Sequence, residues 1–324
     1  MRSLLRHLAT AAILFWLVVT VVFVLVHAAP GDPALLVVSP SASATELARA
    51  RHDLGLDAPI AVQYARWTSA TLHGDFGSSI ASRRPVRSVI ADALPVSFLL
   101  GGTSLLLSFI IGVGLGAWQA RRRGRTSDSV ATALSTAVAS APSFWLALGA
   151  IALFTYGAAR LGFPRWLRLP AFGLHEPSGT VTGLAALGDL ARHSVLPLAV
   201  LTAVGAAGIA RFARSSLLDV IDMEFVRAAR GRGVGGARLA AHVLRVALPG
   251  LLVLLALALP GVIAGSVFVE SVFAWPGMGR AMVTAIAARD HPVVLGATMV
   301  YAGAVIAANL AADLALPLVD PRLR

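Results

Sequence analysis

The chain contains neither cysteine nor lysine, and only 13% of its 324 residues are charged. Without cysteine there is no disulfide, no thiolate nucleophile and no cysteine-ligated zinc. Without lysine there is no phosphate-binding P-loop, because that loop requires a lysine after its glycine. Soluble domains are charged at roughly a quarter of their residues. A chain that is 57% hydrophobic, with a mean hydropathy of +0.79, is therefore not expected to be a soluble protein.

Long uncharged runs are the most abundant feature of the sequence. A bilayer core of roughly 30 Å requires about 20 helical residues. In lipid, a single spanning segment can form hydrogen bonds with all its backbone N–H and C=O groups only as a helix. Six runs of this kind contain no charged side chain, namely residues 8–26, 96–118, 130–159, 194–210, 246–269 and 292–312. The sequence therefore predicts an all-α polytopic membrane protein with six transmembrane helices. Within the long third run, Pro142 predicts a bend.

The first run also resembles the apolar region of a cleaved signal peptide. Arg2 and Arg6 precede it, and Val26-His27-Ala28 resembles a cleavage site. Its 19 uncharged residues exceed the roughly 7 to 15 of such a region, and five further runs follow. We therefore expect a retained transmembrane helix.

The net charge of +11 results from 27 arginines against 16 acidic residues. The arginines lie in loops beside the runs, where lipid phosphate and topology account for them, so no nucleic-acid partner is expected. With the N-terminus inside, the inner segments hold 15 arginines and, apart from Asp313 at the end of the sixth run, five acidic residues, whereas the longer outer segments hold 12 and ten. Short loops weigh most in the positive-inside rule, and residues 121–125 contain four arginines. Both termini are therefore predicted to be cytoplasmic.

The outer segment between the first and second runs, residues 30–95, predicts short helices on the membrane surface. Ser43 and Glu46 form a capping-box pattern at the start of one helix. A second helix is predicted to be capped by Asp57 and to end at Gly74. We expect this segment to pack as a lid on the bundle, and it could also present a docking surface to an external partner.

The loop between the fourth and fifth runs, residues 211–245, has the most distinctive pattern. Acidic residues, among them Glu224, lead into residues 225–230, and four glycines follow within six positions. Acidic residues at the start and glycines past the end favour a helix. The pattern predicts a short protruding helix, where paired alanines allow another backbone to come close and arginines can pair with acidic groups. An ordinary basic loop is the alternative interpretation.

Charged groups within the apolar segments are few. Asp313 and Glu270 lie near the ends of the sixth and fifth runs and are expected near the membrane surface, because an intramembrane charge costs about 2.5 to 3.5 kcal/mol. For Asp313 we expect pairing with arginine, and a transport role is the alternative. An ion-coupled secondary transporter would place paired ionisable groups near the midplane, and the runs contain no such pair. The eight histidines are scattered without the zincin spacing, so we predict no catalytic, cofactor or metal site.

Prolines and glycines interrupt two of the runs. Pro260 and Gly261 lie in the fifth run, and Gly112, Gly114 and Gly116 recur in the second. Such residues are frequent in membrane helices, so kinks and close helix packing explain both features. A gate at Pro260 and Gly261 is the functional alternative.

Motifs along almost the whole chain resemble one family. Residues 224–233 are similar to the cytoplasmic EAA loop of ABC importer permeases, in the form used by the dipeptide, oligopeptide and nickel branch. No single motif is decisive, but many in the same order are specific. The others are Pro30-Gly31-Asp32-Pro33, Leu54-Gly55-Leu56-Asp57 with Pro59, His73-Gly74-Asp75-Phe76-Gly77, Ala141-Pro142-Ser143-Phe144-Trp145, Glu270-Ser271-Val272-Phe273-Ala274-Trp275-Pro276-Gly277-Met278-Gly279, Ala288-Arg289-Asp290-His291-Pro292 and Asp320-Pro321-Arg322.

This resemblance implies a type I ABC importer permease with a MetI-like fold, the B-type member of its permease pair. The implied partners are a homologous second permease, two cytoplasmic ATP-binding subunits, an extracytoplasmic solute-binding lipoprotein and membrane lipid. ATP hydrolysis would belong to the partner subunits, so this chain would not be an enzyme. The cargo expected is a di- or oligopeptide, with nickel, a metal chelate or glutathione as alternatives within the same branch.

The resemblance also assigns an ATPase-coupling loop to Glu224, Arg227, Ala228, Ala229 and Gly233. The first position of the motif, often acidic, is Arg227 here, which leaves open whether Glu224 or an arginine makes the main ionic contact. The expected organisation is an N-terminal transmembrane helix in residues 1–29, an extracytoplasmic helical lid in 30–94, a five-helix permease core in 95–316 with its coupling loop in 211–247, and a cytoplasmic tail in 317–324.

Overall fold

The computed structural model of the chain is built from helices, with one isolated β-bridge, between Ser78 and Pro85, among the residues described. The backbone is described for residues 2–28, 31–36, 38–39, 41–176, 182–264 and 267–319. Side chains are described for the same residues except 2–8, 36, 260, 263–264 and 312–319. The motif at 320–322 and the side chain of Asp313 therefore lie outside the described part of the chain.

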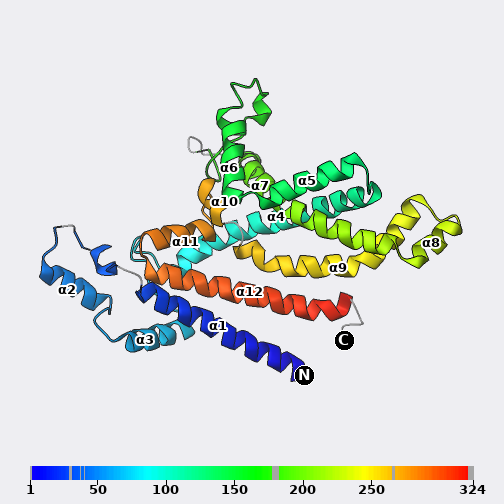
Figure 1. The fold of residues 1–324 in the computed structure, drawn as a ribbon. Coiled ribbons are helices and arrows are strands. Elements are labelled where there is room, and N and C mark those ends of the chain that lie inside the picture. The colour runs from blue at the N-terminus through cyan, green and yellow to red at the C-terminus, as the bar shows by residue number, and fades with distance from the viewer. Residues whose placement is uncertain are drawn as a thin grey trace. The chain divides into compact units, whose positions relative to one another are not determined.

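Within the described residues, five helices are long and apolar enough to cross a membrane, and one bent helix pair is a sixth candidate span (Figure 1). The five are α1 (Arg2–Ala28), α4 (Val86–Arg121), α7 (Leu184–Ile221), α9 (Gly236–Ala264) and α12 (His291–Val319). The bent pair consists of α5 (Thr126–Ser140) and α6 (Ser143–Ile151), which continues into the π-helical turn η2 (Ala152–Tyr156). The predicted all-α polytopic class is confirmed.

The third predicted span contains a sharp break. Its two halves meet at an angle of 100°, and the junction lies at Ala141 and Pro142. Ala141 has extended backbone (φ −75°, ψ 135°), which is the conformation that a following proline favours. The bend predicted at Pro142 is confirmed. It is so large that one apolar run forms two separate helices, α5 and α6.

The chain folds into two compact units. The first contains residues 1–97 and 276–306, and the second contains residues 98–275 and 307–324. Helices α4 and α12 each contribute residues to both units. The remaining elements of the first unit are η1 (Pro33–Leu36), α2 (Ala44–Asp53), α3 (Ile60–Leu72) and α11 (Met278–Ala287). Those of the second unit are η3 (Arg165–Leu167), α8 (Glu224–Gly231) and α10 (Val267–Val272).

In the first unit, α3 packs against α1 through aromatic side chains. The ring of Phe23 in α1 lies 5.1 Å from that of Tyr64 and 5.4 Å from that of Trp67, measured between centroids. The hydroxyl oxygens of Thr20 and Tyr64 are 2.6 Å apart. Aromatic pairs at these distances contribute about 0.5 to 1.5 kcal/mol beyond the area that they bury. The surface helix predicted from this segment therefore packs on the first transmembrane helix.

The helix starts of this segment agree with the sequence in one case and differ in the other. The capping box of Ser43 and Glu46 is present at the start of α2, and hydrogen bonds from Ser43 hold the pKa of the Glu46 carboxyl below its usual value. The cap predicted at Asp57 is wrong. The N-cap of α3 is Pro59, without a side-chain hydrogen bond, because Asp57 lies two residues too early to reach the free amides of the first turn.

The core of the first unit forms where α4 begins and α11 and α12 meet. Val86, Ile90, Met278, Val294 and Ala297 are all buried there. The buried carboxylate of Asp290, the residue before α12, caps this helix, since it accepts a hydrogen bond from the amide of Val293 at 3.5 Å.

In the second unit, α7 is the central helix and contacts α5, α6, α9 and α10. Small residues allow α4 to approach it closely. A Cβ atom built on Gly112 would lie 2.7 Å from Cβ of Ile209, and one on Gly116 would lie 2.6 Å from the carbonyl oxygen of Ala210. The packing role expected of these two glycines is confirmed. Gly114 has no atom within 4 Å of such a Cβ, because a residue two positions away lies on another face of the helix.

Candidate functional site

The predicted loop helix is present as α8, at the end of the second unit where α7 ends and α9 begins (Figure 1). It starts at Glu224, whose negative carboxylate interacts favourably with the positive N-terminal end of the helix dipole. It ends in a Schellman motif, in which the amide of Gly233 donates to the carbonyl of Arg230 at 2.9 Å and the amide of Val234 donates to that of Ala229 at 3.0 Å. Gly233 has a φ of +81°, which favours glycine. The helix end predicted at the glycines is confirmed.

One face of α8 is anchored on the ends of the membrane helices. Val226 is 0% exposed and Ala229 is buried beside it. Val226 belongs to an apolar cluster with buried residues from the ends of α4, α7 and α9, namely Ala120, Leu217, Val220, Val243 and Ala247. The cluster therefore joins α8 to the ends of three membrane helices.

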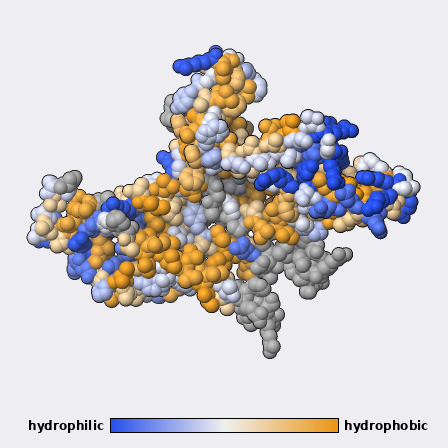
Figure 2. All heavy atoms as spheres, in the orientation of Figure 1, coloured by the Kyte–Doolittle hydropathy of each residue, from blue (hydrophilic) through white to orange (hydrophobic). Residues whose placement is uncertain are grey.

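The opposite face of α8 is open to solvent. Glu224, Phe225, Arg227 and Ala228 are exposed, with Phe225 at 39%. Of the two alanines expected on a shallow surface, only Ala228 lies on this face, because neighbouring residues of a helix point about 100° apart and Ala229 turns inward. In the second unit, Figure 2 shows hydrophilic atoms concentrated at the end that carries α8 and the turn between α4 and α5.

The charged residues around α8 are not equivalent. The guanidinium of Arg227 donates to the carbonyl of Asp222, the C-cap of α7, at 3.2 Å. The carboxylate of Asp222 pairs in turn with Arg123 at 2.8 Å, with both side chains more than half exposed. Glu224 forms no ion pair with any residue that the structure describes. Its carboxylate is therefore free for a partner, whereas Arg227 holds the end of α7.

A buried ion pair between α5 and α7 was not predicted from the sequence. Two nitrogens of Arg214 donate to the two carboxylate oxygens of Asp128 at 2.9 and 2.8 Å. The carboxylate, which is 4% exposed, also accepts from the amide of Gly124 and the hydroxyl of Thr132. The one signal available was that Asp128 is the only acidic residue near the arginine cluster at 121–125.

The predicted gate lies in a closely packed region of the second unit. The backbone is helical at Pro260 and Gly261, and α9 continues to Ala264. A Cβ atom on Gly101 of α4 would lie 1.9 Å from the carbonyl oxygen of Val262, so the two backbones touch there. A cavity of about 330 Å³ between α4, α7 and α9 includes Gly261 in its lining. The side chain of Pro260 is outside the described part, and the gate stays a prediction.

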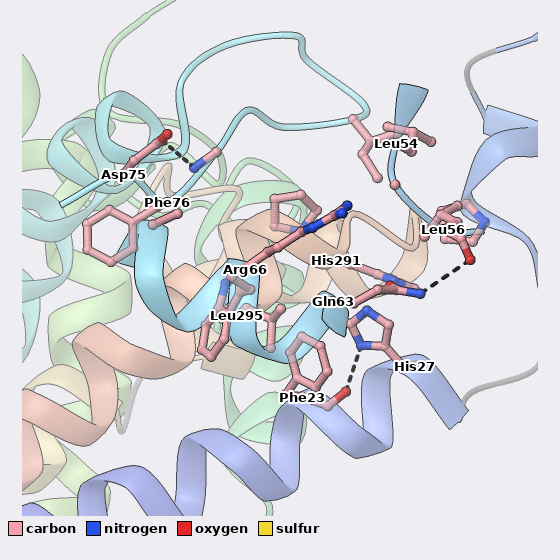
Figure 3. Close-up of a pocket in the computed structure, with 17 residues that line it drawn as sticks. Phe23, His27, Leu54, Leu56, Gln63, Arg66, Asp75, Phe76, His291 and Leu295 are labelled. Carbon is pink, nitrogen blue, oxygen red and sulfur yellow. Dashed lines mark hydrogen bonds between the residues drawn. The ribbon is translucent and has the colours of Figure 1, made fainter. Parts of the chain in front are cut away.

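Four of the sequence motifs meet at one cavity in the first unit (Figure 3). Its volume is about 280 Å³, and α1, α3 and the start of α12 form its walls. Within it, Nδ1 of His27 lies 2.8 Å from the carbonyl oxygen of Phe23, and the side-chain amide nitrogen Nε2 of Gln63 donates to the backbone carbonyl of Leu56 at 3.3 Å. The motif residues in its lining are Pro33, Leu54, Gly55, Leu56, Asp75, Phe76, Gly77, His291 and Pro292. Sequence order gave no indication that these motifs are neighbours.

The same motifs hold the first unit together. The side chain of Asp290, 2% exposed, accepts hydrogen bonds from the hydroxyl of Ser79 and from the amides of Ile80 and Ala81. The guanidinium of Arg289 occupies the space where Gly31 lacks a side chain, since a Cβ there would lie 1.6 Å from it. Both contacts join segments more than 200 residues apart. These motif residues are therefore explained by packing within the unit.

The side chain of Glu270 is 0% exposed, so it is buried within the protein, and its expected place near the membrane surface stays a prediction. Among the residues that the structure describes, no group of three or more histidine, aspartate or glutamate side chains is arranged to hold a metal ion.

Comparison with known proteins gives matches over nearly the whole chain. The family described as "Binding-protein-dependent transport system inner membrane component" matches residues 112–324, and the family for the N-terminal part of such components matches residues 1–101. A probable D,D-dipeptide transport system permease protein of Escherichia coli is 36% identical over 321 residues, covering 94% of this chain and 92% of the relative. An oligopeptide transport system permease protein of Mycobacterium tuberculosis is 37% identical over 275 residues, covering 84% of this chain and 83% of the relative.

Proposed function

Because the chain belongs to the family of binding-protein-dependent transport system inner membrane components, a family of ABC importer permeases, we propose that it imports di- or oligopeptides. It forms half of the translocation pathway and pairs with a second, homologous permease. Two cytoplasmic ATPases drive the pair, and an extracytoplasmic solute-binding protein delivers the cargo. The observation that carries the cargo class is the likeness over most of the chain to relatives that are named as peptide permeases.

We further propose that α8 couples the chain to an ATPase. The exposed face of α8 offers an aromatic side chain, a small residue and a free carboxylate in one turn and a half, which suits a groove on a folded partner. Glu224 makes the main ionic contact in this proposal, because Arg227 is engaged with the end of α7. The buried side of α8 transmits the movement of the ATPase to α4, α7 and α9.

The chain itself has no catalytic role in this proposal. It has no lysine, and so no P-loop of its own. The ion-coupled transporter considered from the sequence is set aside, since the family is one of binding-protein-dependent systems. The remaining alternative is the same role with nickel, a metal chelate or glutathione as cargo.

The cargo is tested by measuring which solute stimulates transport. The chain, its partner permease, the ATPases and the solute-binding protein are reconstituted in liposomes that contain ATP, and uptake of a labelled peptide mixture is compared with uptake of labelled nickel and glutathione. We expect peptides of a few residues to be taken up and to stimulate ATP hydrolysis. Uptake of nickel or glutathione without any effect of peptides would refute the peptide assignment while leaving the permease role intact.

The orientation of the chain is tested separately with reporter fusions. Fusions made after Arg125 and after Arg230 are expected to report a cytoplasmic location, because arginine-rich short loops are retained inside. A fusion after Gly74 is the opposite control and is expected to report the outside. An external signal from either of the first two fusions would overturn the topology.

A further inference from the structure

A cavity of about 270 Å³ lies in the second unit at the level where three membrane helices end or begin. The last turns of α4 and α7 and the first turns of α9 form its walls, and α8 contributes one residue. Most of the lining is apolar, including Ala117, Leu217 and Leu239, and none of it is acidic. The space is therefore an apolar recess at a membrane surface.

Two arginine residues line this recess, Arg121 at the end of α4 and Arg230 in α8. Both residues are exposed, and neither forms an ion pair with a residue that the structure describes. Nearby arginines differ in this respect, since Arg123 pairs with Asp222 and Arg214 with Asp128. Two cations in a recess without an acidic side chain favour an anionic ligand.

The recess continues into an apolar stripe on α9. Leu244 belongs to the lining and is 40% exposed, and Leu248, one turn further along the same face, is 41% exposed. Large aliphatic side chains with this exposure on a membrane helix offer an apolar surface that suits lipid chains. A ligand held by the arginines would therefore have a hydrocarbon surface beside it.

Trp118 places the membrane boundary at the same level. It lies one turn before the end of α4 and is 38% exposed, and the guanidinium of Arg122 lies 4.8 Å from the centre of its ring. Tryptophan and arginine at the end of a membrane helix are typical of the headgroup region.

We propose that this recess binds an anionic phospholipid, with its phosphate between Arg121 and Arg230 and an acyl chain along Leu244 and Leu248. A carboxylate of a soluble partner would satisfy the arginines but would leave the leucine stripe without cover, and a lipid satisfies both. The site goes beyond the proposed transport function and does not depend on the cargo. It places a lipid between α8 and the helices that α8 is anchored on.

The test uses the full chain, purified in detergent with the subunits that accompany it, and titrates labelled phosphatidylglycerol and phosphatidylcholine. Each arginine near anionic lipid contributes about 1 kcal/mol, so phosphatidylglycerol is expected to bind roughly 30-fold more tightly than phosphatidylcholine. The double variant Arg121→Gln with Arg230→Gln is expected to lose this preference. The matched control, Arg125→Gln with Arg238→Gln, removes the same charge from exposed residues that do not line the recess and is expected to retain it.

A third variant tests the recess without changing its charge. Ala240→Phe fills the cavity and leaves both arginines in place, so it is expected to weaken binding of phosphatidylglycerol at least about tenfold, as for loss of one well-packed contact. Equal affinity for the two lipids, or equal losses in the two double variants, would overturn the proposal. So would displacement of the lipid by millimolar inorganic phosphate, which indicates a site for free anions, or binding of the lipid only after the ATPase subunits have been removed, which indicates a protein interface.

Discussion

Replacing Gly233 with valine is expected to leave the chain inserted in the membrane and to reduce ATP-driven uptake roughly tenfold or more. A left-handed conformation costs an L-residue about 1 to 2 kcal/mol, and more when the residue is β-branched. Nothing lies within 4 Å of a Cβ at this position, so the cost arises from the backbone and not from a clash. The strain is relieved if the two hydrogen bonds that end α8 are lost, and α8 then no longer moves with α9 as one body.

The matched control is Gly235→Val. Gly235 lies two residues further along the same loop, has equally open surroundings, and does not have a positive φ. This variant is expected to transport nearly as well as the unchanged protein. Uptake, ATP hydrolysis and the amount of protein in the membrane are measured for both variants. Normal uptake by the Gly233 variant, or equal losses in both, would contradict the assigned role of the α8 end.

Replacing Arg214 with methionine is expected to destabilise the chain by about 3 to 5 kcal/mol. The substitution keeps an apolar stem of similar length but leaves the carboxylate of Asp128 buried without its cation. An unpaired buried charge costs more than the net gain from forming the pair, so the effect exceeds that of a missing surface contact. The free energy of unfolding is measured in mixed micelles by denaturant titration of the full chain.

The control is the same substitution at an exposed pair. Arg123→Met removes the ion pair with Asp222, in which the side chains are 57% and 63% exposed, and is expected to cost less than about 1 kcal/mol. The double variant Asp128→Leu with Arg214→Met is expected to be more stable than Arg214→Met alone, because no buried charge remains. Similar losses for the two single variants would show that the Asp128 pair is not the buried contact described here.

Much of the fold could be predicted from the sequence, because it depends on local patterns. The apolar runs predicted the membrane helices, Pro142 predicted the break between α5 and α6, and the glycines after residue 230 predicted the end of α8. Each of these depends on a few neighbouring residues whose backbone preferences dominate. The predicted cap at Asp57 was wrong although it also depends on local sequence, because Pro59 fixes where α3 begins.

The contacts that join distant segments could not be predicted. Nothing in the sequence indicated that Asp290 would bind the backbone at residues 80–81. The isolated position of Asp128 near the arginine cluster did not indicate that its partner would be Arg214. The sequence also could not predict that Ala228 is exposed and Ala229 buried, because this depends on which face of α8 packs against the membrane helices. Only the structure shows which face of α8 is exposed, and our proposal of Glu224 over Arg227 rests on that face and on the hydrogen bond of Arg227.

We propose that an ATPase drives this chain through α8, and site-directed cross-linking tests this contact most directly. Because the sequence has no cysteine, Ala228→Cys creates a single reactive site on the exposed face of α8, and Leu72→Cys creates a matched one on the lid helix α3. In membranes that contain the whole transporter, the Ala228 variant is expected to cross-link to the ATP-hydrolysing subunit, with a yield that changes when ATP is bound, and the Leu72 variant is not. Cross-linking of the ATPase from Leu72 but not from Ala228 would contradict the account.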